Sequence, residues 1–208
     1  MVFRALYRPF EEADFDAVAD IVGEAWHNEG APKEVARLTA GADLARCLER
    51  STFSQVAVIN TPEEQNVVAG IVLARSGRAA EADRLRWASR EAELMTKVAA
   101  KDPKAVEKLY RYAREEDRIN AELLEKGGVS DRSEVVLLAV DATARGMGIG
   151  SLLLDAAASY LRSEGGSSAY LFTDTSCSWS FYEERGLARA AAIKTPRHLR
   201  KFMCSAYY

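Results

Sequence analysis

The sequence has few residues of the kinds that bind metals or form disulfide frameworks. Its 208 residues include three cysteines, Cys47, Cys177 and Cys204, and two histidines, His27 and His198. The cysteines are widely separated and lack the spacing of zinc ligands, and two histidines are too few to complete a zinc set. We therefore expect no metal cofactor, and we expect the reducing environment of the cytoplasm.

Long hydrophobic runs and a dominant charge are also missing. No apolar run approaches the ~20 residues needed to cross a bilayer, and the first residues, Met1 to Ala5, do not resemble a signal peptide. The 28 basic and 31 acidic residues leave a net charge of −3, so no overall positive field attracts nucleic acids or anionic membranes. We expect neither nucleic acid nor a membrane as a partner.

The chain does contain enough apolar material for one substantial core. Because 48% of its 208 residues are hydrophobic, we expect a single domain spanning residues 1–208. Alternating and β-branched runs predict strands, and apolar residues at helical spacing predict helices. The expected strands are 3–8, 55–59, 67–74, 134–140, 170–173, 188–194 and 201–208, and helices are expected from about residues 15, 32, 149 and 181.

A long charged segment separates the third and fourth of these strands. Strong helix formers predominate between about residues 76 and 131, interrupted at Asp102, which can cap a helix, and Pro103, which can occupy the first helical turn. Two helices are predicted, over about 84–100 and 103–126. Their apolar stripe is only partial, so two interpretations stay open: a lid or subunit contact resting on the core, or a solvated helical hairpin with no role in the site.

The most informative segment is the junction of strand, glycines and helix at residues 135–154. An apolar strand leads to Arg145, then to Gly146, Gly148 and Gly150 in alternation, and then to a helix rich in Leu and Ala. The first turn of a helix has unpartnered N–H groups and a partial positive charge, which suit an anion. Three glycines let the anion approach and permit positive φ where the chain turns. The segment predicts a phosphate-binding loop, and a tight turn without a ligand is the alternative.

Two better-known glycine loops do not fit this segment. A P-loop ends in Gly-Lys-Ser/Thr, but Gly150 is followed by Ser151 and Leu152, so we do not expect nucleoside triphosphate hydrolysis. The dinucleotide fingerprint Gly-x-Gly-x-x-Gly would place its third glycine at Ser151, and too little chain follows for a doubly wound domain.

The segment resembles the GNAT superfamily of acetyl-CoA-dependent N-acetyltransferases. The signature Gln/Arg-x-x-Gly-x-Gly/Ala, which follows the fourth strand of that family, is met by Arg145, Gly148 and Gly150. The closing motif Phe-Tyr-Glu-x-x-Gly-Phe/Leu is similar to residues 181–187. The resemblance is specific over residues 134–187 and implies an α/β GNAT fold: a mixed, strongly twisted sheet flanked by helices, here with a helical insertion before the fourth strand.

The resemblance also implies where acetyl-CoA, the co-substrate, would bind. In this family the coenzyme lies in a V-shaped opening where the fourth and fifth strands splay apart. The implied contacts are Leu138, Ala139 and Val140 for pantetheine, and Arg145, Gly146, Met147, Gly148, Ile149, Gly150 and Ser151 for the diphosphate. Many relatives contact pantetheine with an asparagine where this chain has Thr175, whose hydroxyl is the available substitute.

Two residues are candidates for proton transfer. An alkyl ammonium has a pKa near 10.4, so a base must remove a proton before the amine attacks. Glu134 precedes Arg145 by eleven positions, the spacing at which histone-acetylating members of the family place a glutamate base; the alternative is a solvated carboxylate. Tyr182 stands at the position of the family's general acid, which protonates the departing thiolate; the alternative is a core tyrosine whose hydroxyl is satisfied by backbone.

The activity implied by the resemblance is transfer of an acetyl group from acetyl-CoA to a primary amine by direct attack in a ternary complex. The acceptor is a small molecule or a peptide, and its identity stays open. The alternative function is a CoA-binding regulatory or interaction module without turnover. Dimers are common in the family, so a homodimer is one expectation, with the insertion as its contact surface.

Overall fold

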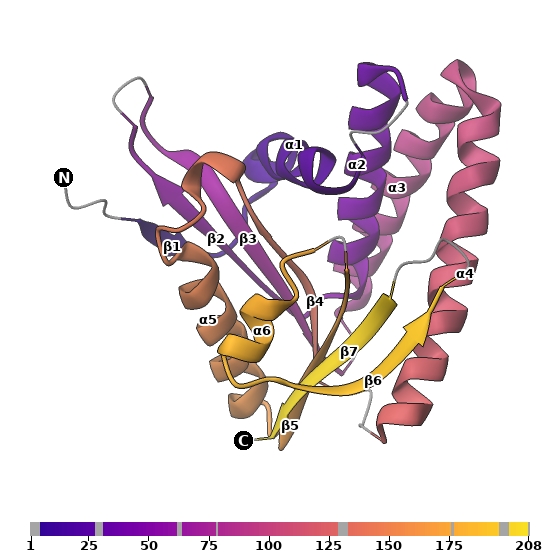
Figure 1. Cartoon of the computed structure of the whole chain (residues 1–208). Helices are drawn as coiled ribbons and strands as arrows, with labels where there is room; N and C mark the ends of the chain where they lie inside the picture. The colour runs from indigo at the N-terminus through magenta and orange to yellow at the C-terminus, as the bar shows by residue number, and fades with distance from the viewer. Residues whose placement is uncertain are drawn as a thin grey trace.

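The computed structural model describes residues 5–27, 31–61, 64–77, 79–128, 133–175, 177–195 and 200–207. Helices and strands follow one another singly or in consecutive pairs along the chain (Figure 1). In chain order they are β1 (Leu6–Arg8), α1 (Phe15–Trp26), α2 (Lys33–Arg50), β2 (Phe53–Ile59), β3 (Val67–Ser76), α3 (Glu81–Lys101), α4 (Pro103–Gly127), β4 (Ser133–Val140), α5 (Ile149–Ser163), β5 (Ser168–Asp174), α6 (Ser180–Glu184), β6 (Ala188–Lys194) and β7 (Arg200–Tyr207).

The strands form one sheet in the order β1-β2-β3-β4-β5-β7-β6. Neighbouring strands are antiparallel except for β4 and β5, which run parallel. The predicted mixed α/β sheet and its predicted strands are confirmed, and β2 and β3 pair as an antiparallel hairpin. The parts of the predicted strands at residues 1–4 and at residue 208 lie outside the described residues.

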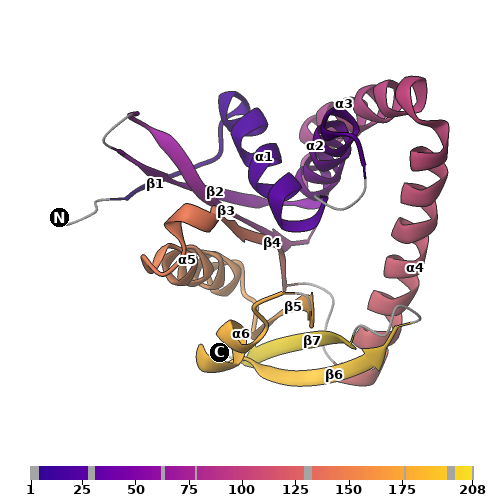
Figure 2. The same cartoon turned by 45° about the horizontal axis from the view of Figure 1, so that its top comes forward.

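Helices cover both faces of the sheet. α1 and α2 lie on one face and α5 lies on the other (Figure 2). In α1 the buried residues Phe15, Val18, Ile21 and Val22 recur at helical spacing and join the core beneath α2. Leu153 and Leu161 of α5 are fully buried in a second core on the opposite face. Among the described helices, none combines the length and the apolar character that a membrane span requires.

The predicted insertion before β4 is confirmed as two long helices. Asp102 caps α4, because its carboxylate accepts hydrogen bonds from the backbone N–H groups of Lys104 and Ala105 at 3.0 and 3.2 Å. Pro103 occupies the first turn, and Gly128 ends the helix in the left-handed conformation with φ of 62°. The two termini of α4 therefore form as the sequence predicts.

The insertion is packed against the rest of the molecule through α3 and through the C-terminal half of α4. α3 lies against α2, and α4 extends to β6 and β7 (Figures 1 and 2). Ile119 and Leu123 of α4 are buried against the ring of Tyr170 on β5. Glu116 of α4 forms an ion pair at 2.5 Å with Lys201 of β7, which is itself buried. The insertion therefore rests on the core, and its role in the site stays a prediction.

Truncating the apolar contact of α4 tests this packing. We expect Leu123→Ala to lower the free energy of unfolding by about 2–5 kcal/mol, because Leu123 is fully buried and its truncation leaves a cavity. The matched control is Leu85→Ala on α3, whose side chain is 60% exposed, for which a change within about 0.5 kcal/mol is expected. Denaturant unfolding followed by tryptophan fluorescence measures both. Equal effects of the two variants would contradict a packed α4.

Candidate functional site

The turn between β4 and α5 contains the predicted phosphate loop. After β4 the chain forms a short 3-10 helix, which Asp141 caps by accepting a hydrogen bond from the N–H of Thr143 at 2.8 Å. Gly146 and Gly148 then each adopt φ of 79°, a left-handed conformation that glycine reaches without strain. These two glycines direct the chain into α5.

The first turn of α5 is open to an anion. Gly148 is the N-cap residue and carries no side chain, and no other described side chain caps the helix. Arg145, Gly146 and Met147 are exposed beside it, and the Arg145 Nε–H donates a hydrogen bond to the carbonyl of Val140 at 3.3 Å. The loop thus combines unpartnered helical N–H groups with a guanidinium group, which is a combination that binds phosphate.

Gly150 has a different role from the other two glycines. It lies inside α5 and is not among the residues with positive φ, so the expectation that all three glycines serve the turn is wrong for this one. A Cβ atom added at Gly150 would lie 3.5 Å from Val140 Cγ2 and 3.7 Å from Phe181 Cζ. The ring of Phe181 therefore brings α6 against the start of α5.

β4 and β5 separate directly after the pair formed by Glu134 and Tyr170. Within the described chain this is the one residue pair of their ladder. The other edge of β4 stays paired with β3 up to Val140, apart from a bulge at Val136. Because β5 has moved away, the edge of β4 at residues 138–140 presents backbone groups that lack a strand partner on that side. The predicted pantetheine contacts therefore lie along an open strand edge.

Tyr182 lies on α6, beside the separating strands. Burial raises the pKa of its phenol, and the nearby thiols of Cys177 and Cys204 raise it further. Tyr182 therefore stays protonated at neutral pH and has a proton to donate. Its ring packs against the core that lies beneath α5, and its role as general acid stays a prediction.

The predicted threonine contact and a second threonine flank the end of β5. Thr175 is exposed one residue beyond the strand. Thr173 is buried within β5, and its hydroxyl oxygen has no hydrogen-bond partner among the described residues. An unpartnered buried hydroxyl next to an open strand edge suits a ligand with amide groups.

Glu134 lies at the start of β4, and its carboxylate is buried with only 3% of the residue exposed. Its Oε2 accepts hydrogen bonds from Arg50, from Arg75 Nη2 at 3.0 Å and from the Tyr170 hydroxyl at 3.4 Å. Arg75 also donates to the Tyr170 oxygen at 3.1 Å. The alternative of a solvated carboxylate at a strand start is therefore wrong.

Sequence reasoning missed the three partners of Glu134. Arg50 ends α2, Arg75 lies near the end of β3 and Tyr170 lies on β5. Burial raises the pKa of the Tyr170 phenol, and the Glu134 carboxylate raises it further, so this phenol stays neutral. The three residues carry no motif, and they come together only through strand pairing and the placement of α2 on the sheet, so no signal along the chain identifies them.

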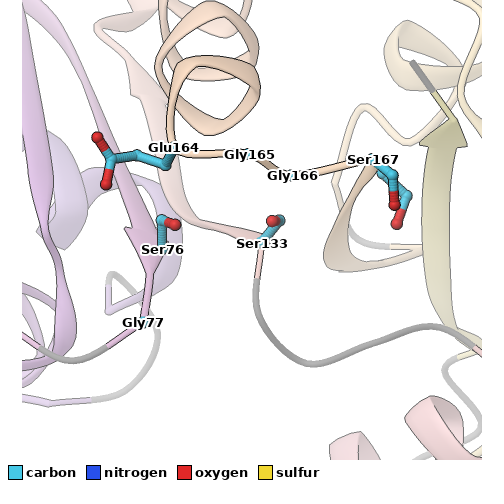
Figure 3. Close-up of a pocket in the computed structure, with 8 residues that line it drawn as sticks. Ser76, Gly77, Ser133, Glu164, Gly165, Gly166 and Ser167 are labelled. Atoms are coloured by element: carbon cyan, nitrogen blue, oxygen red, sulfur yellow. The ribbon is translucent and has the colours of Figure 1, made fainter.

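A cavity beside the sheet lies away from the glycine loop. It has a volume of about 490 Å³ and lies at the end of α5, opposite the glycine loop, where the turn at 164–167 passes above Ser76 and Ser133 (Figure 3). Its described lining is Ser76, Gly77, Ser133, Glu164, Gly165, Gly166, Ser167 and Ser168. This lining has no basic side chain, so the cavity does not suit a diphosphate.

Metal chemistry has no evident location in the described residues. Nowhere among them do three His, Cys, Asp or Glu side chains gather closely enough to hold an ion.

Comparison with known proteins adds independent information. The sequence model of the acetyltransferase (GNAT) family matches residues 62–187, which is more than half of the chain. No curated protein matches the sequence.

Solved structures share the fold over almost the whole chain. A mosquito arylalkylamine N-acetyltransferase like 5b has a TM-score of 0.56 and 16% identity, covering 99% of this chain and 100% of that chain. A chain of the NatC complex bound to Gag peptide and CoA has a TM-score of 0.55 and 14% identity, and the match covers 99% of this chain and 99% of that chain. The ribosomal-protein-S18-alanine N-acetyltransferase from Escherichia coli has a TM-score of 0.54 and 13% identity. The match covers 98% of this chain and 94% of that chain.

Removing the charge of Glu134 tests its ion pairs. We expect Glu134→Gln to lower the free energy of unfolding by about 2–4 kcal/mol, because two guanidinium groups then face a neutral amide; the partial exposure of both arginines keeps the effect below that of a fully buried pair. The control is Glu122→Gln, which removes a solvent-accessible carboxylate paired with Lys126 at 2.7 Å and should leave stability nearly unchanged. Thermal and denaturant unfolding measure both variants, and similar small changes would refute the network.

Proposed function

The chain belongs to the acetyltransferase (GNAT) family and is an acyltransferase, and we propose that it transfers the acetyl group of acetyl-CoA to a primary amine in a ternary complex. The observation that carries this proposal is the separation of β4 from β5 directly beside an uncapped helix start. One end of that opening suits a diphosphate, and its edge suits the amide groups of pantetheine. The acetyl group, at the thioester end of the coenzyme, then lies in the opening between β4 and β5.

Acetyl-CoA binds along the loop and the open edge of β4. The N–H groups of Ile149, Gly150 and Ser151, with the guanidinium of Arg145, hold the diphosphate, and Gly146, Met147 and Gly148 shape the loop. Leu138, Ala139 and Val140 pair with pantetheine through their backbone. The unpartnered hydroxyl of Thr173 is a side-chain contact available within β5, and Thr175 stays the contact that the family resemblance implies.

The acceptor amine loses a proton to Glu134, directly or through a water, and attacks the thioester carbonyl. A backbone N–H near Leu138 stabilises the oxyanion of the tetrahedral intermediate. When that intermediate collapses, the carbon–sulfur bond breaks and the thiolate takes the proton of Tyr182, while the second proton that the nitrogen loses in becoming an amide restores the phenol. The products are the N-acetylated amine and free coenzyme A. The ion pairs of Glu134 hold its Oε2 in place. This supports transfer of the amine proton through a water rather than directly to the carboxylate.

The acceptor is an amine of a small molecule or a peptide. Proteins with the same fold include one named for arylalkylamines and one named for an alanine of ribosomal protein S18. Because those likenesses extend to the fold alone, they support both classes of acceptor equally.

Release of free thiol from acetyl-CoA in the presence of an amine panel tests the proposed activity. We expect turnover, and we expect Tyr182→Phe to lower kcat by about 10²–10⁴-fold because the leaving thiolate then lacks its proton donor. The control is Tyr110→Phe on α4, whose side chain is 53% exposed and should leave kcat unchanged. Binding of acetyl-CoA without thiol release across the whole panel would instead identify a CoA-binding module without turnover.

The glycine loop is tested separately through coenzyme affinity. We expect Gly148→Ala to raise the Kd for coenzyme A at least about tenfold, because φ of 79° strains an alanine and its Cβ stands before the helix N–H groups. The control is Gly165→Ala at the other end of α5, where φ is 85° and the surrounding space is equally open. Isothermal titration calorimetry measures both variants. An equal loss of affinity in the two would place the diphosphate elsewhere.

A further inference from the structure

The two oxygen atoms of the Glu134 carboxylate have different surroundings. Oε2 accepts hydrogen bonds from Arg50, from Nε and Nη2 of Arg75 at 3.2 and 3.0 Å, and from the Tyr170 hydroxyl at 3.4 Å. Oε1 accepts none from the residues that the structure describes. Because an oxygen needs a free lone pair to take up a proton, Oε1 is the atom of this carboxylate that is available for proton transfer.

Tyr170 links two members of this group. Its hydroxyl donates to Glu134 Oε2 and accepts a hydrogen bond from Arg75 Nη2 at 3.1 Å. Its backbone is also paired with that of Glu134, in the one pair of the β4–β5 ladder within the described chain. Strand register and a side-chain contact therefore both place Tyr170 beside the carboxylate.

The ring of Tyr170 is held firmly in the core. The residue is only 1% exposed, Ile119 and Leu123 of α4 pack against it, and the Phe172 ring meets it edge-on at a centroid distance of 5.5 Å. An immobilised ring carries its hydroxyl at a fixed position, because a tyrosine side chain has few rotatable bonds. The insertion thus supports a hydrogen-bond donor that faces Glu134.

The arginine partners of Glu134 are less restrained than this phenol. Their side chains are long, have many rotamers and are 40% exposed at Arg50 and 23% exposed at Arg75. The phenol bond itself is long, at 3.4 Å against an ordinary O–H···O distance of about 2.7–2.8 Å. Its contribution is therefore to the orientation of the carboxylate more than to the free energy of unfolding.

We propose that Tyr170 is a positioning residue for acetyl transfer: its hydroxyl holds Oε2 of Glu134, and Oε1 receives the proton of the acceptor through a water. This inference rests on the proposed acetyl transfer. In the step itself an N–H bond of the acceptor ammonium breaks, the water passes on a proton, and an O–H bond forms at Oε1. The nitrogen keeps the electron pair with which it attacks the thioester, and Tyr170 keeps its own proton.

The other groups that contact this carboxylate do not change charge near neutral pH. Arg50 and Arg75 stay charged, and burial, with the charge of Glu134, raises the pKa of the Tyr170 phenol. Burial also raises the pKa of the nearby Cys47 thiol on α2 to about 12. Glu134 is therefore the member of this group whose protonation can change in the acidic range.

Acids on the neighbouring helices can titrate in the same range. They include Asp43 and Glu49 on α2, Glu91 on α3, whose pKa is raised by burial, and Glu116 on α4, which is paired with Lys201. All of them are kept in every variant below. A change that depends on Glu134 is therefore identified by comparing variants with and without its carboxylate.

The test measures thiol release at saturating acetyl-CoA with the amine that turns over fastest, and follows kcat against pH. We expect Tyr170→Phe to lower kcat by about 3–10-fold and to move the acidic limb of the profile upward by about half to one pH unit. The limb moves upward because the charged carboxylate loses a donor and takes up a proton at higher pH. The KM for acetyl-CoA should stay unchanged.

The matched control is Tyr160→Phe on α5. The Tyr160 hydroxyl is part-buried and donates to Thr52 Oγ1 at 2.8 Å, and its ring stacks on Phe53, so this variant also loses one hydrogen-bonded phenol. We expect its kcat and pH profile to match the wild type. Melting temperatures report whether each variant is folded.

The double variant Glu134→Gln/Tyr170→Phe distinguishes positioning from a general structural role. If Tyr170 acts through the carboxylate, its substitution has nothing left to disturb once the carboxylate is gone, and kcat of the double variant equals that of Glu134→Gln. An independent structural effect would instead lower kcat further by the same factor as in the wild type.

A second substitution keeps the hydroxyl and the fold. A tyrosine analogue fluorinated next to its hydroxyl, incorporated at position 170, is a stronger hydrogen-bond donor than tyrosine, so the acidic limb of kcat should move to lower pH. A limb that stays in place or moves upward would contradict the inference, whether or not Tyr170→Phe folds.

The outcomes separate this inference from the proposed activity. A wild-type kcat and pH profile in Tyr170→Phe, an equal change in Tyr160→Phe, or an additive loss in the double variant would each overturn the inference alone. Full kcat in Glu134→Gln would overturn the role of Glu134 as base and this inference with it. Absence of thiol release from the wild type with every amine would overturn the proposed activity itself, on which the inference rests.

Discussion

The separation of β4 from β5 after a single residue pair is the constraint on which the rest of the structure depends. Parallel strands cannot be joined by a tight hairpin, so the chain crosses from β4 to β5 through α5. The start of α5 must then lie at the end of β4, where the two strands have already parted. The left-handed glycines at 146 and 148 make that turn possible, and they leave helical N–H groups facing the mouth of the opening. The phosphate loop and the open strand edge are thus two results of one topology.

The insertion contacts the strands beside this opening through α4, which packs on β6, β7 and the ring of Tyr170. α4 is fixed to β7 by the pair of Glu116 and Lys201, and to α2 by the pair of Asp117 and Arg46 at 3.0 Å. Its apolar residues pack on Tyr170, which is also the β5 member of the single β4–β5 pair. A change in α4 therefore acts on the base of the opening, where Glu134 lies. This placement gives the insertion a physical route to influence acceptor choice without itself carrying a reacting group.

The charges at the base of the opening combine a structural and a chemical role. Removing two ions from water is expensive, and the attraction between them recovers that cost only when the geometry is good. Here one carboxylate oxygen accepts from two guanidinium groups and a phenol, so its position is tightly defined. A carboxylate held in this way keeps its position through contacts within the chain itself.

The sequence by itself determined the features that are local in the chain: the helix ends at Asp102 and Gly128, the hairpin of β2 and β3, the glycine turn, and the family, through the spacing of Arg145 and its glycines. Such features depend on backbone preference and short-range periodicity. Only the tertiary structure decided the environment of Glu134, the ordinary helical role of Gly150 and the packed position of the insertion. Those depend on strand register and on contacts between residues far apart in sequence, and a periodic pattern contains no information about which distant side chain will face a given carboxylate.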